Sequence, residues 1–212
     1  MRSALDYLAG RSVFSDLVIA SLTKQRGPSS TLYELKMTLR GSEPPIWRRL
    51  QVPGSIKLDR LHEVFQVAMG WTDSHLHQFV DPPMVYSVPS EEDYPGVERL
   101  DERRFRLADL AQHEKASFLY EYDFGDGWGH DVLVEKIVSA GPEKKRAVCL
   151  AGEKACPPED CGGIWGYYEL LEALNNPKHE SHQEMLDWLG EPFDPGRFDP
   201  EEVNAILRRL KL

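Results

Sequence analysis

Two short segments of this sequence combine the residue types that bind metal ions and assist hydrolysis. The first is Tyr122–His130 and the second is Cys156–Gly163. Both contain carboxylates and glycines; the first adds an imidazole within its nine residues and the second adds thiols within its eight. An ordinary connecting loop does not require this mixture. We therefore expect the two segments to mark a functional site and to meet at a common concavity, together with His75 and His77.

One candidate metal site begins with these two histidines. Residues 75–80 form a short segment that begins with polar and apolar types in alternation, which predicts a strand. Because side chains two positions apart on a strand share a face, His75 and His77 would point the same way. The alternative is that both histidines are simply exposed on that face.

A hairpin would add an acid–base pair to the same site. Residues 118–124 and 130–138 are rich in β-forming types and flank a glycine-rich turn. A two-residue turn at 126–127 would place Asp123 opposite His130. The alternative is that Asp123 orients His130 or fixes the turn without an ion. The complete ligand set is His75, His77, Asp123 and His130, which suits zinc or a similar ion.

Three cysteines form a second candidate zinc site. Cys149, Cys156 and Cys161 supply three soft ligands, although their spacing lacks the paired two-residue intervals of zinc ribbons. Their number is odd and we recognise no export signal, so a disulfide framework is not expected. The alternative is a rigid loop, built by the pairs 157–158 and 162–163, in which Cys161 is a buried apolar residue.

Aromatic and acidic side chains around the two segments make up a candidate binding surface. Glu159 and Asp160 either cap the helix that follows them or face a nearby cation. Trp128 is either a lid or a core aromatic residue, and Asp126 fits the turn position that its type favours. The candidate binding residues are Trp47, Arg48, Trp71, Tyr122, Asp123, Asp126, Trp128, His130, Glu159, Asp160 and Tyr167.

The uneven charge of the chain bears on its partners. The 212 residues carry a net charge of −10; residues 1–50 hold eight Lys or Arg against four Asp or Glu, and residues 51–212 hold 17 against 31. This acidic body repels phosphate backbones, so duplex DNA is not expected as the principal ligand. The cluster Trp47–Arg49, which includes Arg48, is the best candidate for a phosphate contact, and the alternative is that its arginines are solvated on the outer face of a strand.

Composition and length also suggest how the chain is organised. No apolar run reaches the roughly 18 residues that span a bilayer, so we expect no membrane association and a cytoplasmic location. Residues 1–30 end in a Gly/Pro/Ser stretch and are interpreted as an appendage and linker. Residues 31–212 are expected to form a single domain.

Strands and a few helices must position the candidate residues. Residues 33–39 alternate in polarity and predict a strand, and Pro44–Pro45 turns the chain into a second strand over 46–52, so the two predict a hairpin. Apolar residues at three- and four-residue spacing predict a helix over 58–69 that ends at Gly70. Residues 81–104 predict a long surface loop. We predict an α+β fold: a mixed, largely antiparallel sheet with a packed N-terminal helix and a C-terminal helical segment.

The order and spacing of several motifs resemble one known family. The motifs are Pro45–Arg49, Leu61–His62 with Met69–Trp71, His75–Phe79, Tyr122–His130, and Pro157–Gly163 with Gly166–Tyr167. Over about residues 31–210 the chain is similar to the plasmid pRiA-type ORF-three-like family, also labelled passenger TnpR-like proteins of insertion elements. The resemblance implies a compact α+β domain of bacterial or archaeal origin and an association with mobile elements. It implies no particular reaction.

Two classes of function stay open. The first is a binding or adaptor module that holds a protein or small ligand among its clustered aromatic residues. The second is a metal-assisted hydrolase, in which the ion activates water and Asp126 or Glu159 serves as the base. We favour the binding module, because no motif has the specificity of a catalytic signature. A serine recombinase, which the TnpR label suggests, is not expected: the acidic body lacks a serine among arginines and a basic DNA-binding module.

Overall fold

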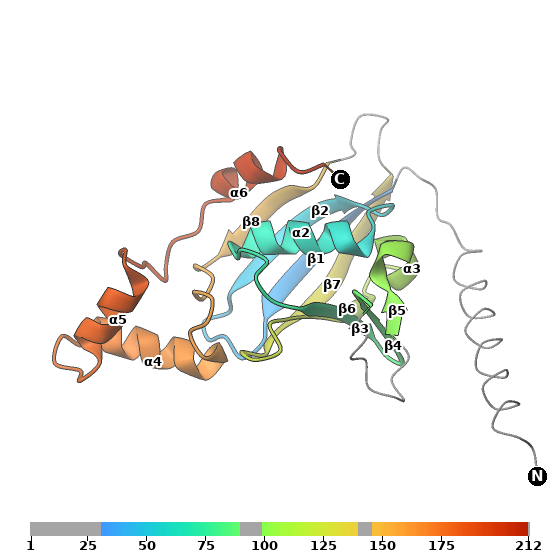
Figure 1. The fold of residues 1–212 in the computed structure, drawn as a ribbon. Coiled ribbons are helices and arrows are strands. Elements are labelled where there is room, and N and C mark those ends of the chain that lie inside the picture. The colour runs from blue at the N-terminus through green and yellow to red at the C-terminus, as the bar shows by residue number, and fades with distance from the viewer. Residues whose placement is uncertain (1–30, 90–98, 140–145, 212) are drawn as a thin grey trace, which may run out of the picture.

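The computed structural model describes residues 31–89, 99–139 and 146–211, which form an eight-stranded sheet flanked by helices (Figure 1). The strand order is β5-β4-β3-β6-β7-β1-β2-β8, and every neighbouring pair is antiparallel except β4 with β5. The strands are β1 (Thr31–Leu39), β2 (Trp47–Pro53), β3 (His77–Asp81), β4 (Met84–Ser87), β5 (Arg99–Asp101), β6 (Ser117–Tyr122), β7 (Trp128–Ser139) and β8 (Val148–Glu153). The predicted α+β class and largely antiparallel sheet are confirmed, while the predicted appendage, residues 1–30, lies outside the described residues.

The helices surround this sheet unevenly. In Figure 1, α2 crosses one face of the sheet, α6 lies beside β8, and α4 and α5 form an arm at one end. No helix in the described part of the chain has the length and hydropathy of a membrane span. The helices are α2 (Leu58–Met69), the 3-10 helix η1 (Glu102–Arg104), α3 (Leu107–Leu110), α4 (Gly163–Asn175), α5 (His182–Leu189) and α6 (Pro200–Leu207).

Helix α2 supplies much of the core. Leu61, Val64 and Phe65 on its inner face are fully buried, and each such side chain contributes roughly 1.5–3 kcal/mol of burial free energy. The helix ends at Gly70, whose left-handed backbone (φ 95°) lets its N–H donate to the Gln66 carbonyl. The predicted helix and its end are therefore confirmed, as is the β1–β2 hairpin.

The C-terminal helix protects the edge of the sheet. Asn204 on α6 accepts a hydrogen bond from the Cys149 N–H at 2.8 Å and donates one to the Cys149 carbonyl at 2.9 Å. This side-chain amide takes the place of a neighbouring strand, because it satisfies both backbone groups of the edge strand β8 at one position. The predicted C-terminal helical segment thus completes the fold.

Three local predictions were wrong. Strand β3 begins at His77, so His75 lies outside it and the two histidines do not share a strand face. The link between β6 and β7 is five residues long, and His130 pairs with Tyr120 rather than with Asp123. The described parts of the predicted loop over 81–104 contain β4, β5 and η1.

Candidate functional site

The two segments singled out by the sequence meet in space. The Gly162 N–H donates to Asp126 Oδ2 at 3.1 Å, and the Tyr122 hydroxyl donates to Glu159 Oε1. Gly163 lies so close to the backbone of Asp126 that a Cβ atom added to the glycine would be 2.4 Å from the Asp126 carbonyl oxygen. The loop after β6 and the loop after β8 therefore form one junction, which confirms that part of the prediction.

His75 lies at this junction and faces one carboxylate from each loop. Its Nε2 atom is 3.1 Å from Asp160 Oδ1 and 3.7 Å from Asp123 Oδ2. One atom from each of these three residues lies within 4.8 Å of the others, the spacing of ligands around one metal ion. His75 Nε2 is buried and makes no hydrogen bond of acceptable geometry within the described structure, despite the short distance to Asp160. We call His75, Asp123 and Asp160 the loop cluster.

Asp123 is held so that one of its two oxygens is free for the cluster. Its Oδ1 accepts hydrogen bonds from the N–H groups of Gly125 (3.0 Å) and Asp126 (3.3 Å), which fixes the turn. Its own N–H donates to the Leu76 carbonyl at 2.9 Å, which ties the turn to the residue after His75. Asp123 and Asp160 both have left-handed backbones, with φ of 53° and 58°. Such conformations are uncommon outside glycine, and aspartate is among the residues that adopt them more often.

A second set of contacts supports the backbone next to His75. The Ser74 N–H donates to the Tyr122 hydroxyl at 3.0 Å, while Thr72 donates from its N–H to Glu159 Oε2 at 3.1 Å. Burial, and then the hydrogen bond to Glu159, raises the pKa of Tyr122. Tyr122 therefore stays a hydroxyl and links the two sides of the junction.

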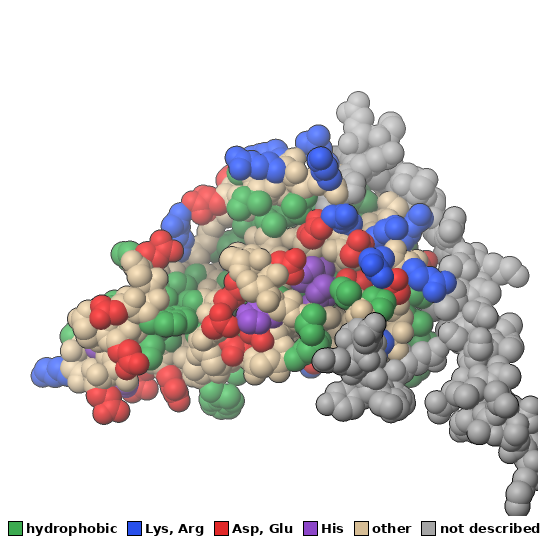
Figure 2. All heavy atoms as spheres, in the orientation of Figure 1, with side chains coloured by type: hydrophobic (Ala, Val, Ile, Leu, Met, Phe, Trp, Pro, Cys, Tyr) green, Lys and Arg blue, Asp and Glu red, His purple; other side chains and the backbone are tan. Residues whose placement is uncertain are grey.

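His77, the other predicted ligand, belongs to a different group. Its Nε2 lies 2.9 Å from Glu102 Oε2, and its ring stacks on that of His62 with 3.4 Å between centroids. His62 in turn lies 2.7 Å from Asp73 Oδ1. Sequence reasoning did not select His62, Asp73 or Glu102 as ligands, and it placed Glu102 in a loop. Figure 2 shows histidine side chains beside acidic side chains on the face in view.

His130 and Trp128 are core residues rather than parts of either group. His130 is fully buried, packs edge-on against Trp71 (5.4 Å between centroids) and has Nδ1 3.3 Å from the Tyr120 carbonyl. Burial lowers its pKa to about 4, so the ring is neutral at neutral pH. The predicted four-ligand set is therefore wrong: the structure keeps His75 with Asp123, adds Asp160, and separates His77 and His130.

The cysteines do not assemble a metal site in this structure. All three are free, and neither ligand group found among the described residues contains one. Burial raises the pKa of Cys149 to about 11 and of Cys161 to about 12, which keeps both as thiols. The alternative interpretation, in which Cys161 packs as a small apolar residue, agrees with its partly buried place against the core.

Arg48 is also structural, which corrects the expectation of a solvated or phosphate-binding side chain. Arg48 is 1% exposed, and its guanidinium group donates to the carbonyls of Ala68 (2.8 Å) and Glu153 (3.1 Å). Its guanidinium carbon lies 3.9 Å from the centroid of the Phe198 ring. Trp47 lies beside it on β2, where its Nε1 donates to a Glu153 carboxylate oxygen. These contacts join β2, α2, β8 and the segment before α6.

The remaining aromatic candidates line the inner side of the junction. Trp71 stacks on Tyr122 with 5.0 Å between centroids and donates from Nε1 to the Pro157 carbonyl at 3.0 Å. Tyr167 is buried near Phe193. These rings fix the loops in place and leave little aromatic surface for a ligand.

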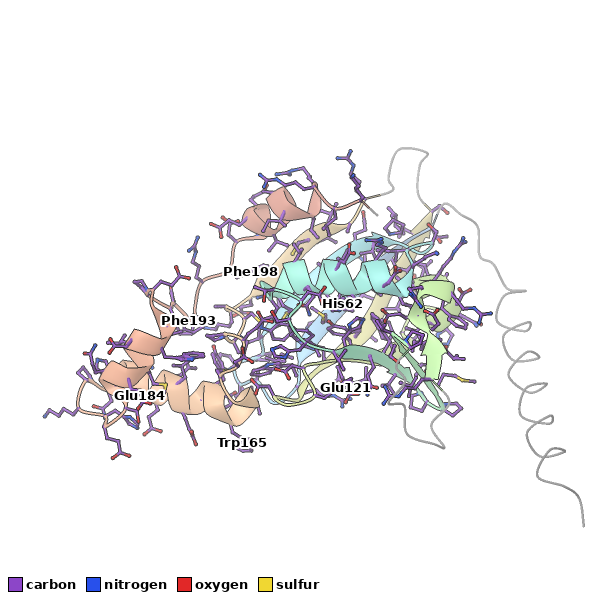
Figure 3. The ribbon with its side chains drawn as sticks, in the orientation of Figure 1. His62, Glu121, Trp165, Glu184, Phe193 and Phe198 are labelled. Carbon is purple, nitrogen blue, oxygen red and sulfur yellow. The ribbon has the colours of Figure 1, made fainter. Side chains whose placement is uncertain are left out.

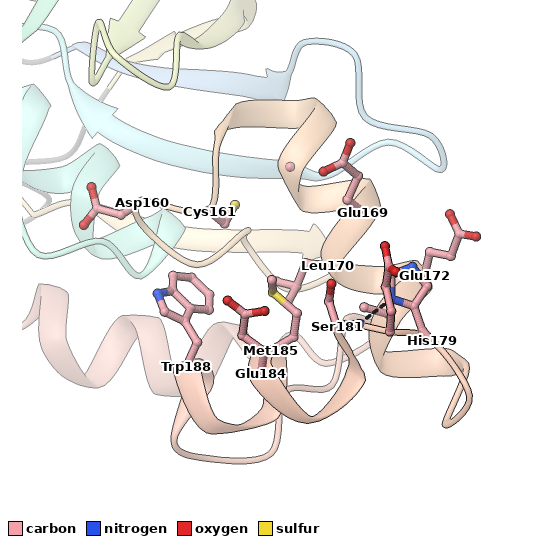
Figure 4. A pocket seen from close by; sticks show the side chains of 13 residues that line it. Asp160, Cys161, Glu169, Leu170, Glu172, His179, Ser181, Glu184, Met185 and Trp188 are labelled. Carbon is pink, nitrogen blue, oxygen red and sulfur yellow. Dashed lines mark hydrogen bonds between the residues drawn. The ribbon is translucent and has the colours of Figure 1, made fainter.

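A cavity of about 570 Å³ opens beside Asp160, between α4 and α5 (Figure 4). Leu170, Met185 and Trp188 form its apolar part. The lining described by the structure contains no Lys or Arg and five carboxylates, which are Asp160, Glu169, Glu172, Glu180 and Glu184. The loop cluster thus borders an acidic cavity large enough for a small ligand.

Comparisons with known proteins agree with the fold. The model of the family described as "Plasmid pRiA4b ORF-3-like protein" matches residues 31–202. A relative from Sinorhizobium fredii, described as "Uncharacterized protein y4hQ", is 46% identical over 184 residues, which cover 85% of this chain and 93% of the relative. The crystal structure of "Protein of Unknown Function MM3350" from Methanosarcina mazei Go1 superposes with a TM-score of 0.72 at 37% identity, covering 82% of this chain and 97% of that chain.

Proposed function

We propose that this chain, which belongs to the plasmid pRiA4b ORF-3-like family, is a binding module that uses a divalent metal ion held by the loop cluster. The names of its relatives state no activity, so the proposal rests on the site. Its main support is the convergence of His75, Asp123 and Asp160 from three separate segments, with ligand atoms within 4.8 Å of one another. One imidazole and two carboxylates suit zinc or a similar first-row ion.

The environment of the cluster favours an open metal site. The Asp160 side chain is 68% exposed and the His75 side chain 29%, whereas Asp123 is almost buried. Three protein ligands leave at least one position free for a ligand atom. The ion would therefore be reachable from solvent and from the cavity beside Asp160.

The cavity indicates what kind of ligand would be bound. A small molecule with an oxygen donor would coordinate the ion, while the carboxylates of α4 and α5 would attract a positively charged group on the same molecule. A purely anionic ligand would be repelled by this lining. We therefore favour a ligand that carries both an oxygen donor and a cationic group.

The contacts of Asp126 and Glu159 argue against the alternative function, a metal-assisted hydrolase. The hydrolase needs a carboxylate that is free to take a proton from water. Asp126 accepts from the Gly162 N–H, and Glu159 accepts from Tyr122 and Thr72. Both oxygens of Glu159 are thus engaged in joining the two loops, and Asp126 is held at the same contact through Oδ2. An association with mobile elements stays a prediction from the family resemblance.

Titration of the purified full chain with Zn²⁺ by calorimetry tests the proposal. Asp160→Asn should weaken binding at this site at least tenfold, because it removes a charged ligand without disturbing the core. Asp131→Asn serves as the matched control, since Asp131 is exposed and pairs only with Arg40 among the described contacts. Equal affinity in the wild type and Asp160→Asn would refute the metal site. Hydrolysis of ester or phosphoester substrates that depends on zinc and Asp160 would favour the hydrolase instead.

A further inference from the structure

We propose that the ligand of this binding module is a basic segment of another protein, which places Arg or Lys side chains in the cavity between α4 and α5. The inference rests on the proposed function, because it names the class of ligand that this cavity takes. The oxygen donor and the cationic group would then belong to one peptide. We call the cavity of about 570 Å³ between α4 and α5 the arm cavity.

The glutamates that line the arm cavity have no partners in the described structure. Residues 159–191 hold eight Asp or Glu and one Lys, so the arm is strongly negative. Four glutamates of the lining make no ion pair or side-chain hydrogen bond with another described residue; they are Glu169, Glu172, Glu180 and Glu184. Exposed carboxylates elsewhere behave differently, since Asp131 pairs with Arg40 and Glu202 pairs with Arg197. The arm therefore keeps free negative charge that a cationic partner would neutralise.

Apolar side chains lie among these carboxylates. Leu170, Met185 and Trp188 face the cavity from α4 and α5 (Figure 4). Arg and Lys carry long aliphatic stems, which can lie on such a surface while the charged end stays among the carboxylates. The Trp188 ring, which is 47% exposed, also offers a face to the cation. A basic side chain thus matches both parts of the lining, whereas an inorganic cation would use only the charge.

Exposed apolar side chains on the same arm extend the surface beyond the cavity. Leu186 on α5 is 39% exposed, and Trp165 on α4 is 79% exposed. Figure 3 shows Trp165 directed outward from α4, while Glu184 stands on α5. Exposed tryptophan is enriched among the residues that anchor protein–protein contacts, and a small amine in the cavity would leave Trp165 in water. A peptide segment is therefore the occupant that uses the whole arm.

The charge of the arm disfavours other large partners. Nucleic acids and anionic membrane surfaces carry negative charge, which this surface would repel. A second copy that presented the same arm across a two-fold axis would bring its own eight carboxylates against these. A partner that is itself basic meets neither obstacle.

Fluorescence anisotropy with three labelled synthetic peptides of equal length tests the inference on the full chain. One peptide alternates Arg with Leu, the second alternates Glu with Leu, and the third alternates Arg with Ser. We expect the Arg–Leu peptide to bind and the Glu–Leu peptide not to bind. The Arg–Ser peptide should bind about tenfold more weakly than the Arg–Leu peptide, because it lacks the apolar contacts.

Variants of the arm locate the binding. Glu169→Gln/Glu184→Gln removes two unpaired charges and should weaken the Arg–Leu peptide about fivefold. Trp188→Ala removes the exposed ring and should weaken it about tenfold. The control Asp131→Asn/Glu202→Gln also loses two carboxylates, so it has the same net charge as the first variant, and it should keep the wild-type affinity. All five side chains are exposed, so each variant should fold.

Three results would overturn the inference. The first is equal affinity of the wild type and Glu169→Gln/Glu184→Gln for the Arg–Leu peptide. The second is displacement of this peptide by an equal concentration of spermine, which would indicate a site for small amines. The third is a dimer in sedimentation velocity that Trp188→Ala dissociates, because a second copy would then occupy the arm.

The metal site and the basic partner fail separately. Peptide affinity is measured with Zn²⁺ present and after treatment with a chelator, and zinc affinity is measured by calorimetry. Peptide binding that depends on Glu169, Glu184 and Trp188 in a chain that takes up no zinc would keep the basic partner and remove the metal site. Zinc binding that depends on Asp160, in a chain that does not bind the Arg–Leu peptide, would keep the metal site and overturn the basic partner.

Discussion

His75 and His77 stand two residues apart, yet their surroundings differ in almost every respect. His75 lies in a bend before β3 and faces carboxylates from two loops, one of them largely exposed. His77 lies on β3, stacks on a helix residue and contacts a fully buried glutamate. The same residue type thus serves a solvent-accessible junction in one case and the packed interior in the other.

The difference indicates a division of roles. The buried group around His62 and His77 depends on secondary structure, because α2, β3 and β6 position His62, His77 and Tyr120. The loop cluster depends on turn hydrogen bonds and left-handed residues. His62, His77 and Glu102 are buried, whereas Asp160 of the loop cluster is largely exposed. Changes in the buried group should therefore affect stability first, and changes in the loop cluster should affect binding first.

The largest expected effect separates the two groups by stability. His62→Ala removes a buried ring that stacks on His77 and bonds to Tyr120, so it should lower the free energy of unfolding by about 3 kcal/mol. His75→Ala should cost less than about 1 kcal/mol, because the side chain is partly exposed and forms no hydrogen bond of good geometry in the described structure. Urea unfolding of chelator-treated protein measures both values. Similar losses in the two variants would contradict the proposed division.

The pH dependence of stability sharpens the comparison through His130, which belongs to neither group. Its pKa is about 4 when folded and 6.5 ordinarily, so the unfolded chain takes up this proton first as the pH falls. Above pH 6.5 the low pKa of His130 therefore contributes about 3 kcal/mol to the free energy of unfolding. This contribution is lost as the pH falls toward 4. His130→Gln should therefore show a shallower loss of unfolding free energy between these pH values. The control variant is His113→Gln, at an exposed site, in which the unfolding free energy should depend on pH as in the wild type. The same dependence in His130→Gln would show that burial does not suppress the positive charge of the His130 ring.

The smallest expected effect probes the contact between the two loops. Gly163 and Gly127 both have φ of 70°, but only at Gly163 would a Cβ meet a neighbouring backbone atom, the Asp126 carbonyl oxygen at 2.4 Å. Gly127→Ala should cost about 1 kcal/mol for the left-handed backbone. Gly163→Ala should cost about 1 kcal/mol more and also weaken zinc binding by the loop cluster. Equal stability and zinc affinity in the two variants would show that the loop contact does not support the site.

Local patterns were sufficient to predict much of the fold. The apolar spacing of α2, its end at Gly70 and the alternation of β1 are all set within a few residues. The meeting of the two biased loops was also predicted, from their composition. The buried position of Arg48 had a signal that was not used: it stands two residues before Leu50, so it shares the buried face of β2.

The ligand groups could not be derived in the same way. His75 was assigned to a strand by alternation, but Ser74 is held by the Tyr122 hydroxyl and β3 starts only at His77. The buried group around His62 and His77 joins α2, the turn after it, β3 and η1, and such contacts depend on strand order rather than on spacing. Glu102 carries no local sign of burial, because its partner His77 is 25 residues away.

An anomalous difference map from zinc-soaked crystals of the full chain is the most direct test of the loop site. The account predicts a peak about 2.1 Å from His75 Nε2 and within bonding distance of Asp123 Oδ2 and Asp160 Oδ1. A map with both loops ordered and no peak among these three atoms would contradict it.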